Sequence, residues 1–358
     1  MSDTEVRQSL VKPLWRRALQ VVASILCAST ATLAGSTHGP ISPTNIFAPD
    51  STAAHSIYRL SLFVLELTGA IYVVVFSLLL YAAIKFRQRK HDDNNDFEPP
   101  QIYGSNQIEL AWTVVPVIIV LVLFVSAAQV IHRVQDARRP KRTIEVTAVG
   151  HQYWWEYQYT QFGFVTSNEL HIPVSDPPNS TPTFIGLQSA DVDHSFWVPR
   201  LAGKTDLIPN HPNSMWIDPQ NPGIYLGQCA QFCGVQHAKM LLRVYVDRQA
   251  DFDRWVHEQQ QDGVSDPSVA DGAGLFTDKG CFVCHTIRGT AAQGQIGPDL
   301  THIMSRDTLG AGLVPITREN LRRWIRDPGV FKPGSLMPAQ DLTDQELDKI
   351  TAYLLTLR

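Results

Sequence analysis

Two long uncharged apolar stretches constrain this chain more than any other feature of its sequence. Residues 67–84 and 110–131 contain no Asp, Glu, Lys or Arg, and the second stretch is 22 residues long. A helix needs about 20 apolar residues to cross a bilayer, so we expect transmembrane helices over 60–84 and 110–131. The two helices form a hairpin, which places the segments before and after it on one side of the membrane.

The N-terminus has the pattern of a secretion signal. Basic residues up to Arg17 precede residues 18–34, a run of 17 uncharged and mostly apolar or small residues, which is short for a membrane span. We expect a signal peptide over 1–34 and an exported segment over 35–59. A retained anchor and lipid attachment at Cys27 are the alternatives. Cleavage would leave the loop between the two spans in the cytoplasm and export everything after residue 132.

Charge and cysteine content narrow the possible functions. There are 30 Lys and Arg against 34 Asp and Glu, for a net charge of −4, so no nucleic-acid partner is expected. Four of the five Cys fall in two motifs. A purely structural disulfide would therefore use cysteines that one of these motifs needs for its own function.

The first cysteine motif is GQCAQFCGVQHAKM at 227–240, with Cys229, Cys233, His237 and Met240. Thiolate, imidazole and thioether are ligands that suit copper. A blue-copper site uses one Cys, so two Cys indicate two copper ions that share two bridging sulfurs. A second imidazole is expected from His194, in a short loop flanked by strand-like sequence. A disulfide or a zinc site are the alternatives, although the thioether counts against zinc.

The second cysteine motif is CFVCH at 281–285, the signature of covalent c-type haem attachment. Cys281 and Cys284 would bind the haem vinyl groups, and His285 would be the proximal ligand. A thioredoxin-like pair and a zinc site are the alternatives, but no βαβ pattern surrounds the motif and the adjacent His would have no role.

The opposite side of the haem requires a second ligand. Met337 lies in a turn-rich loop, whereas Met304 lies in a helix-like run close to the haem motif. A Met ligand raises the reduction potential of a haem, and we expect Met337 to provide it. The segment GPDL at 297–300 is similar to the cytochrome c turn whose Pro carbonyl accepts a hydrogen bond from the proximal imidazole.

The sequence between the second span and the haem motif is rich in strands. Residues 143–149 alternate between polar and apolar, and short strand-like runs separated by turn residues follow, which predicts a sandwich or small barrel. We expect a transmembrane hairpin over 60–131, a copper domain over 132–257, a linker over 258–273 and an all-α haem domain over 274–358. The last helix should begin at Thr343, with Glu346 completing a capping box.

These motifs together resemble cytochrome c oxidase subunit II of the caa type, in which a cytochrome c domain follows the copper domain. The resemblance covers the chain from about residue 55 to its end. It implies a multidomain membrane protein with a two-helix hairpin, an all-β cupredoxin-like Greek-key sandwich and a class I cytochrome c domain with one haem c. It also implies a dinuclear copper A centre held by Cys229, Cys233, His194, His237, Met240 and the carbonyl of Gln231.

Position 231 departs from the family pattern. The usual residue is Glu, whose side chain also helps to hold a magnesium ion at the interface with subunit I. Gln231 keeps the carbonyl that the copper site needs but has no carboxylate, so the resemblance does not support the magnesium contact here.

Two further segments resemble functional parts of the family. QIELAWT at 107–113 is similar to the segment whose Glu begins a proton path into subunit I, and Glu109 is the matching residue; a solvated helix end is the alternative. HQYWWEY at 151–157 is similar to the aromatic segment that receives electrons from cytochrome c. Tyr153, followed by Trp154, replaces the usual first Trp, which fits a fused donor. A packed strand face is the alternative.

The resemblance implies a subunit of an oxidoreductase and proton translocase. Electrons from cytochrome c or another donor would pass through the haem and copper A to the haem of subunit I, where oxygen is reduced to water. The implied partners are subunit I, other oxidase subunits and membrane lipid. The implied location is the bacterial inner membrane, with both metal domains on the periplasmic or extracellular side. A copper A-containing nitric oxide reductase subunit and a membrane-anchored copper carrier or electron shuttle are the alternatives, whereas a quinol oxidase subunit would lack the copper ligands.

Overall fold

The computed structural model describes residues 45–87, 101, 103–135, 143–175, 181–263 and 266–358. All of them belong to one compact unit, Pro43–Arg358. The expected signal peptide and Cys27 lie outside the described residues.

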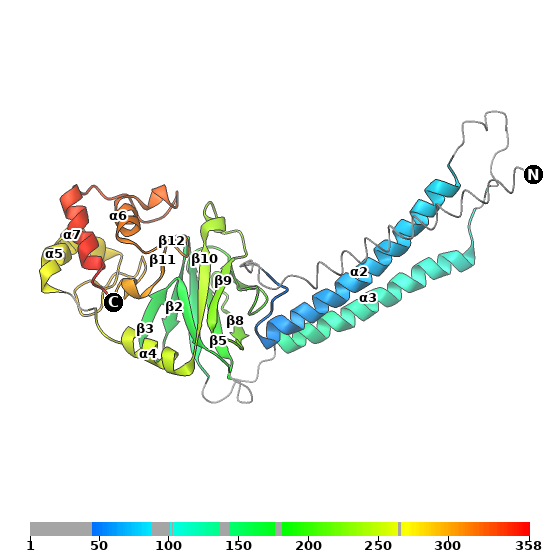
Figure 1. The fold of residues 1–358 in the computed structure, drawn as a ribbon, viewed down its shortest axis with the longest axis horizontal. Coiled ribbons are helices and arrows are strands. Elements are labelled where there is room, and N and C mark those ends of the chain that lie inside the picture. Colours follow the sequence, from blue (N-terminus) through cyan, green and yellow to red (C-terminus); the bar gives the residue numbers. More distant parts are fainter. Residues whose placement is uncertain (1–44, 88–100, 102, 136–142, 176–180, 264–265) are drawn as a thin grey trace, which may run out of the picture. The chain divides into compact units, whose positions relative to one another are not determined.

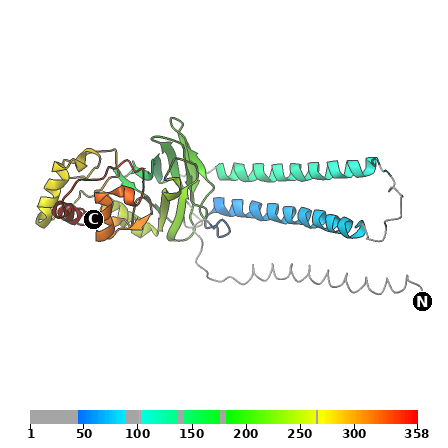
Figure 2. The same cartoon turned by 90° about the horizontal axis from the view of Figure 1, so that it is seen from above.

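Helices α2 (Thr52–Lys85) and α3 (Asn106–Gln135) run side by side (Figure 1, Figure 2). Both are long and apolar enough to cross a membrane. Helix α2 begins before the span that we predicted, inside the expected exported segment, because the side chain of Ser51 caps it by accepting a hydrogen bond from the amide of Ala54. Pro116 lies within α3 without ending it.

Partly buried polar contacts join helices α2 and α3 to the next domain. At the start of α2, the amide and hydroxyl of Thr52 bond to the carboxylate of Asp218 at 3.0 and 2.6 Å. At the end of α3, the indole nitrogen of Trp216 donates to the carbonyl of Val134 at 2.6 Å. The hairpin is therefore anchored at both ends to one side of a sandwich.

The sandwich consists of two five-stranded sheets, as the strand pattern predicted. Neighbours in one sheet are, in order, β3 (Phe164–Ser167), β2 (Trp154–Tyr159), β1 (Glu145–His151), β5 (Thr183–Ser189) and β8 (Asn213–Ile217). The other sheet has β4 (Glu169–Pro173), β10 (Leu241–Asp247), β9 (Gly223–Cys229), β6 (His194–Trp197) and β7 (Thr205–Leu207). Pairs β1–β5 and β4–β10 are parallel, and the other pairs are antiparallel.

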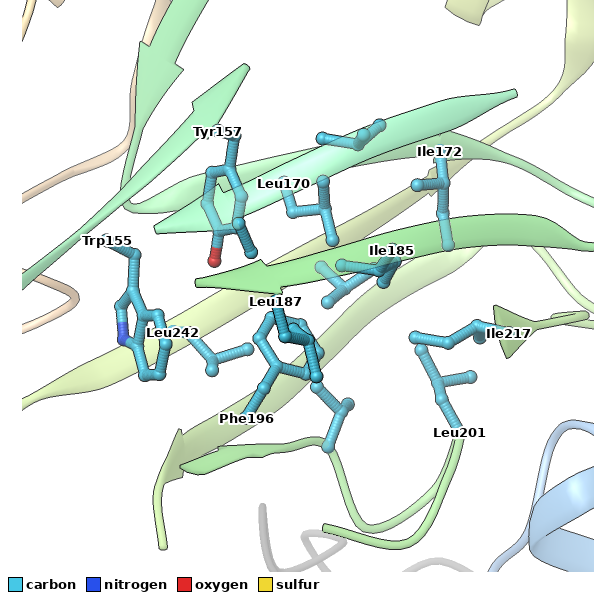
Figure 3. Packing of buried hydrophobic residues seen from close by; sticks show 14 of the residues in the cluster. Trp155, Tyr157, Leu170, Ile172, Ile185, Leu187, Phe196, Leu201, Ile217 and Leu242 are labelled. Atoms are coloured by element: carbon cyan, nitrogen blue, oxygen red, sulfur yellow. The ribbon is translucent and has the colours of Figure 1, made fainter. Parts of the chain in front are cut away.

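Large aromatic and aliphatic side chains fill the space between the sheets. Figure 3 shows Trp155 and Tyr157 of β2 packed near Leu187 of β5 and Phe196 of β6, and all four side chains are fully buried. Complete burial stabilises each large side chain by about 1.5–3 kcal/mol. This core holds the ends of β6 and β9 rigidly. His194 is the first residue of β6 and not part of a loop as we expected.

The C-terminal domain is helical. Helix α4 (Gln249–Gln259) packs on the sandwich. It is followed by η2 (Pro267–Val269), α5 (Ala270–Asp278), η3 (Cys281–Val283), η4 (Ile303–Ser305), β11 (Thr308–Leu309), β12 (Val314–Pro315), α6 (Arg318–Arg326), η5 (Pro328–Val330) and α7 (Asp344–Leu354). We expected an irregular linker over 258–273. Helix α4 extends to Gln259, and η2 begins at Pro267, so only the middle of this range lies between helices. The predicted capping box of Thr343 and Glu346 is present at the start of α7.

Candidate functional site

Sheet pairing brings the ligands of the first motif together. Cys229 ends β9 and Met240 immediately precedes β10, and the amide of Cys229 donates to the carbonyl of Met240 at 2.9 Å, which closes the loop between them. His237 begins the short helix η1 (His237–Lys239) inside this loop. Strand β6 pairs with β9, with Phe196 opposite Cys229, so His194 at the start of β6 is carried to the same place.

The six residues predicted to bind copper converge. The two sulfurs of Cys229 and Cys233 are 3.9 Å apart, well beyond the roughly 2.05 Å of a disulfide bond. Each thiol has a different imidazole beside it. The remaining separations are 3.9 Å from Cys229 Sγ to His194 Nδ1, 3.7 Å from Cys233 Sγ to His237 Nδ1, 3.9 Å from Cys233 Sγ to Met240 Sδ and 3.2 Å from Cys229 Sγ to the carbonyl of Gln231.

The arrangement of the donors bears on how many ions they can hold. In the described part of the chain, the ligand atoms of His194, Cys229 and Cys233 lie within 4.8 Å of one another, and this group does not extend to His237. Two ligands of one zinc ion, bound at 2.0–2.3 Å, are at most about 4.6 Å apart. An imidazole at each end of a central pair of thiols suits two ions better than one.

Burial and mutual hydrogen bonding shift the pKa values of the two thiols in opposite directions. Cys229 and Cys233 are 2% and 3% exposed. The hydrogen bond between the two thiols, assisted by His194, lowers the pKa of Cys229 far below the usual thiol value. The same hydrogen bond, together with burial, raises the pKa of Cys233. Cysteine binds metal as the thiolate, so a bound cation would release the protons that the two thiols still hold.

A chain of hydrogen bonds that involves no predicted copper-binding atom orients His194 and Cys233. His194 Nε2 lies 2.7 Å from Asp191 Oδ1, which leaves Nδ1 of the ring facing Cys229. The other oxygen of Asp191 accepts from the amide of Gln152 at 2.6 Å, and Gln152 Nε2 donates to the carbonyl of Cys233 at 2.6 Å. A carboxylate behind a metal-binding imidazole fixes its tautomer and orientation. Asp191 and Gln152 were not assigned this role from sequence, although Asp191 lies only three residues before His194.

The haem motif opens onto a cavity of about 360 Å³. Cys281, Cys284 and His285 line it, together with many apolar side chains. His285 Nδ1 lies 2.7 Å from the carbonyl of Pro298, which is the contact that the GPDL segment suggested. Burial lowers the pKa of His285, so the ring is neutral, with Nδ1 donating to Pro298 and Nε2 left as the electron-pair donor. The cavity and its donors thus fit a covalently attached haem.

The two methionines considered as haem ligands differ in position. Met337 lines the cavity together with His285. Met304 instead packs against the hydrophobic core of the C-terminal domain. The cavity therefore favours Met337 as the residue that faces a bound haem.

Part of the cavity wall belongs to the sandwich. Gln152, Tyr153, Trp154 and Asn168 line the same cavity as His285. Tyr153 is also 9% exposed and part of the sandwich core, so the segment both packs and faces the haem cavity. The two sites share Gln152, which lines the cavity and contacts the carbonyl of Cys233.

Glu109 is distant from both sites. It lies in the first turn of α3, whereas Val134 at the other end of this helix contacts the sandwich. At 1.5 Å per residue, the two positions are about 38 Å apart along the helix. The structure leaves its predicted role in proton uptake untested.

Comparison with known protein families gives three matches that together span most of the chain. Residues 42–130 match the transmembrane domain of cytochrome c oxidase subunit II, and residues 174–246 match its periplasmic domain. Residues 269–358 match cytochrome c.

Two relatives cover most of this chain, and a solved structure covers one domain. Cytochrome c oxidase subunit 2 of Alkalihalophilus pseudofirmus is 31% identical over 318 residues, which cover 87% of this chain and 90% of that protein. Cytochrome c oxidase subunit 2 of Bacillus sp. (strain PS3) is 33% identical over 293 residues, which cover 76% and 80%. A crystal structure of the periplasmic domain of subunit II of cytochrome oxidase from Bradyrhizobium japonicum is 28% identical, with a TM-score of 0.32, and covers 34% of this chain and 97% of that one.

Proposed function

This chain belongs to the cytochrome c oxidase subunit II family and ends in a cytochrome c domain, and we propose that it relays electrons from that domain to subunit I of a haem–copper oxidase. Bound haem c and a dinuclear copper A centre supply the redox chemistry. The chain supplies ligands, burial and orientation. The observation that carries the proposal is Gln152, because it lines the haem cavity and also donates to the carbonyl of Cys233.

We assign the copper ligands as Cys229, Cys233, His194 and His237, whose sulfur and nitrogen atoms would hold the two ions. Met240 and the carbonyl of Gln231 complete the set. The separations of 3.2–3.9 Å between neighbouring donors support this assignment. A rigid frame of this kind changes little when an electron arrives, which favours fast transfer.

We assign the haem ligands as His285 and Met337, with Cys281 and Cys284 as the covalent attachment points. Their positions around one cavity support this assignment. Tyr153 and Trp154 belong to the part of the wall that the copper domain provides, and we assign them as the segment through which electrons leave the haem.

The remaining assignments concern the membrane location, the partner proteins, proton uptake and the magnesium site. The two membrane-length helices support a membrane-embedded subunit, and we place it in the bacterial inner membrane with the copper domain (132–257) and the haem domain (274–358) outside the cytoplasm. Subunit I receives the electrons, cytochrome c or another donor provides them, and Glu109 contributes to proton uptake. Gln231 lacks the carboxylate of the usual Glu, so we propose that its side chain gives no charged ligand to an interface magnesium ion.

The decisive experiment is metal analysis of the full chain purified in detergent after haem attachment and copper loading. Two coppers and one haem per chain, with a seven-line mixed-valence signal in electron paramagnetic resonance, are expected. One copper with a four-line signal would overturn the dinuclear assignment and favour a copper carrier. Oxygen turnover by the purified complex, compared with nitric oxide turnover, distinguishes an oxidase from a nitric oxide reductase.

A further inference from the structure

We propose that the haem domain braces the copper-ligand loop (residues 229–240), so that the copper centre is completed only when the two domains are docked. This inference rests on the proposed function of the two sites. Two segments of the haem domain form the brace: the turn at residues 310–312 and the loop at residues 331–335.

The brace forms three hydrogen bonds to residues that flank the ligands His237 and Met240. Two reach the copper-ligand loop, at Gln236 and Lys239, and one reaches Leu241, the first residue of β10. They are Gln236 Nε2 to the carbonyl of Pro333 at 2.7 Å, Lys239 Nζ to the carbonyl of Phe331 at 3.0 Å and the amide of Leu241 to the carbonyl of Ala311 at 3.1 Å.

The turn at 310–312 is inserted into the sandwich. Ala311 is completely buried and packs within the hydrophobic core of the copper domain. Its φ of 61° and the φ of 82° at Gly312 are left-handed, which makes the turn tight. A Cβ at Gly312 would lie 3.0 Å from Cβ of Leu241. The close approach allows a main-chain hydrogen bond to form beside the copper ligand Met240.

Lys332 joins the two segments of the brace to each other and to the haem cavity. The residue is 3% exposed. Its side-chain nitrogen donates to the carbonyl of Gly310 at 2.9 Å and to the carbonyl of Tyr153 at 2.6 Å. A buried polar group is costly unless it is hydrogen-bonded, and the docked arrangement places both acceptors within reach of this buried nitrogen.

A buried carboxylate of the copper domain fixes the base of the turn. Glu169 on β4 is 2% exposed. Its carboxylate accepts from the amides of Asp307 and Thr308, at 3.0 and 2.9 Å, and from the hydroxyl of Thr308 at 2.7 Å. Hydrogen bonds to a charged acceptor are stronger than neutral ones. Glu169 of the sandwich therefore fixes the residues that directly precede the turn at 310–312.

The brace should matter most for the ligands His237 and Met240. Cys229 lies at the end of a core strand, whereas His237 and Met240 lie in the segment that the brace contacts. The brace restricts this segment without touching the metal. The haem domain is thus a positioning element for His237 and Met240, and loss of docking should loosen these two ligands before it affects Cys229.

The test uses the full chain with haem attached and copper loaded. The double variant Gln236→Leu/Lys239→Met removes two side-chain bonds of the brace, and Lys332→Met removes the link between its segments. Lys349→Met is the matched control, because Lys349 on α7 pairs with Asp271 at the surface. We expect copper release to a chelator to be about tenfold faster in the first two variants, with an altered copper spectrum. The haem spectrum should be unchanged in the double variant, and the control should show no change in either measurement.

Unchanged copper release and copper spectra in both brace variants would overturn the proposal. Should these variants fail to fold, amide hydrogen exchange of the unaltered, copper-free chain decides instead. The Leu241 amide should then be as protected as the Cys229 amide, whose acceptor lies in the copper domain itself; rapid exchange at Leu241 would overturn the brace. Absence of the two-copper signal from the unaltered chain would instead contradict the proposed function.

Discussion

The side-chain nitrogen of Gln152 lies 2.6 Å from the carbonyl oxygen of Cys233. Because Gln152 also lines the haem cavity, this single hydrogen bond is a short through-bond connection between the two sites. Asp191 extends the connection to His194. The backbone of Gln152 is thus connected to His194 through Asp191, and its side chain is connected to Cys233.

Replacement of Gln152 by Leu should slow electron transfer from haem to copper. It should also lower the copper reduction potential by up to about 40 mV, since the lost hydrogen bond is worth about 1 kcal/mol. Potentiometric titration and rapid-mixing kinetics of the loaded full chain measure the two effects. Gln158→Leu is the control, because Gln158 bonds to Glu156 on β2. Equal rates and potentials in Gln152→Leu and the unaltered chain would contradict the connection.

Replacement of Met337 by Leu should lower the haem reduction potential by on the order of 100 mV, because a thioether ligand raises it. Met304→Leu conserves volume at a packed position and should leave the potential unchanged. Optical redox titration of both variants provides the measurement. A drop in Met304→Leu alone would move the ligand assignment to Met304.

Replacement of Gly297 by Ala should disturb the haem ligand His285. The new Cβ would lie 2.7 Å from Cε1 of the ring, which the carbonyl of Pro298 holds in place. We expect a loss of about 1–3 kcal/mol of stability and a smaller fraction of low-spin haem, measured by thermal unfolding and optical spectra.

Gly274→Ala is the matched control for that change. Nothing lies within 4 Å of the new Cβ at this position in α5, so the variant should gain about 0.5–1 kcal/mol. Equal effects at the two glycines would show that contact with His285 is not the cause.

Lys332 should make the stability of the docked haem domain depend on pH. Burial lowers the pKa of this lysine to about 7, below its ordinary value of about 10.4 in an unfolded chain. Between these values the unfolded chain binds more protons than the folded one. The unfolding free energy should therefore rise with pH, by at most about 1.4 kcal/mol per pH unit from this group.

The measurement is denaturant unfolding from pH 6.5 to 9, followed by haem absorption. Lys332→Met should lose the part of the slope that Lys332 contributes, whereas Lys349→Met should keep it. Parallel curves for the unaltered chain and Lys332→Met would show that the lysine stays charged in the folded protein.

The sequence by itself determined which residues can bind the metals and which segments are long and apolar enough to cross a membrane. Cys229, Cys233, His237 and Met240 lie within 12 residues, and Cys281 to His285 within five, so the chain alone keeps each set together. The length of the apolar stretches determined the hairpin, and the local hydrogen bonds of Thr343 and Glu346 determined the start of α7. These features depend on near neighbours, which a sequence displays directly.

Only the tertiary structure decided how the two sites are connected. Lys332 finds an acceptor 179 residues away at Tyr153, and Glu169 finds a donor 139 residues away at Thr308. Neither residue differs in sequence from an ordinary solvent-exposed charge. His194 likewise reaches Cys229 only because β6 pairs with β9. Such contacts depend on sheet pairing and domain docking, which arise from burial of the whole core and have no local pattern in the sequence.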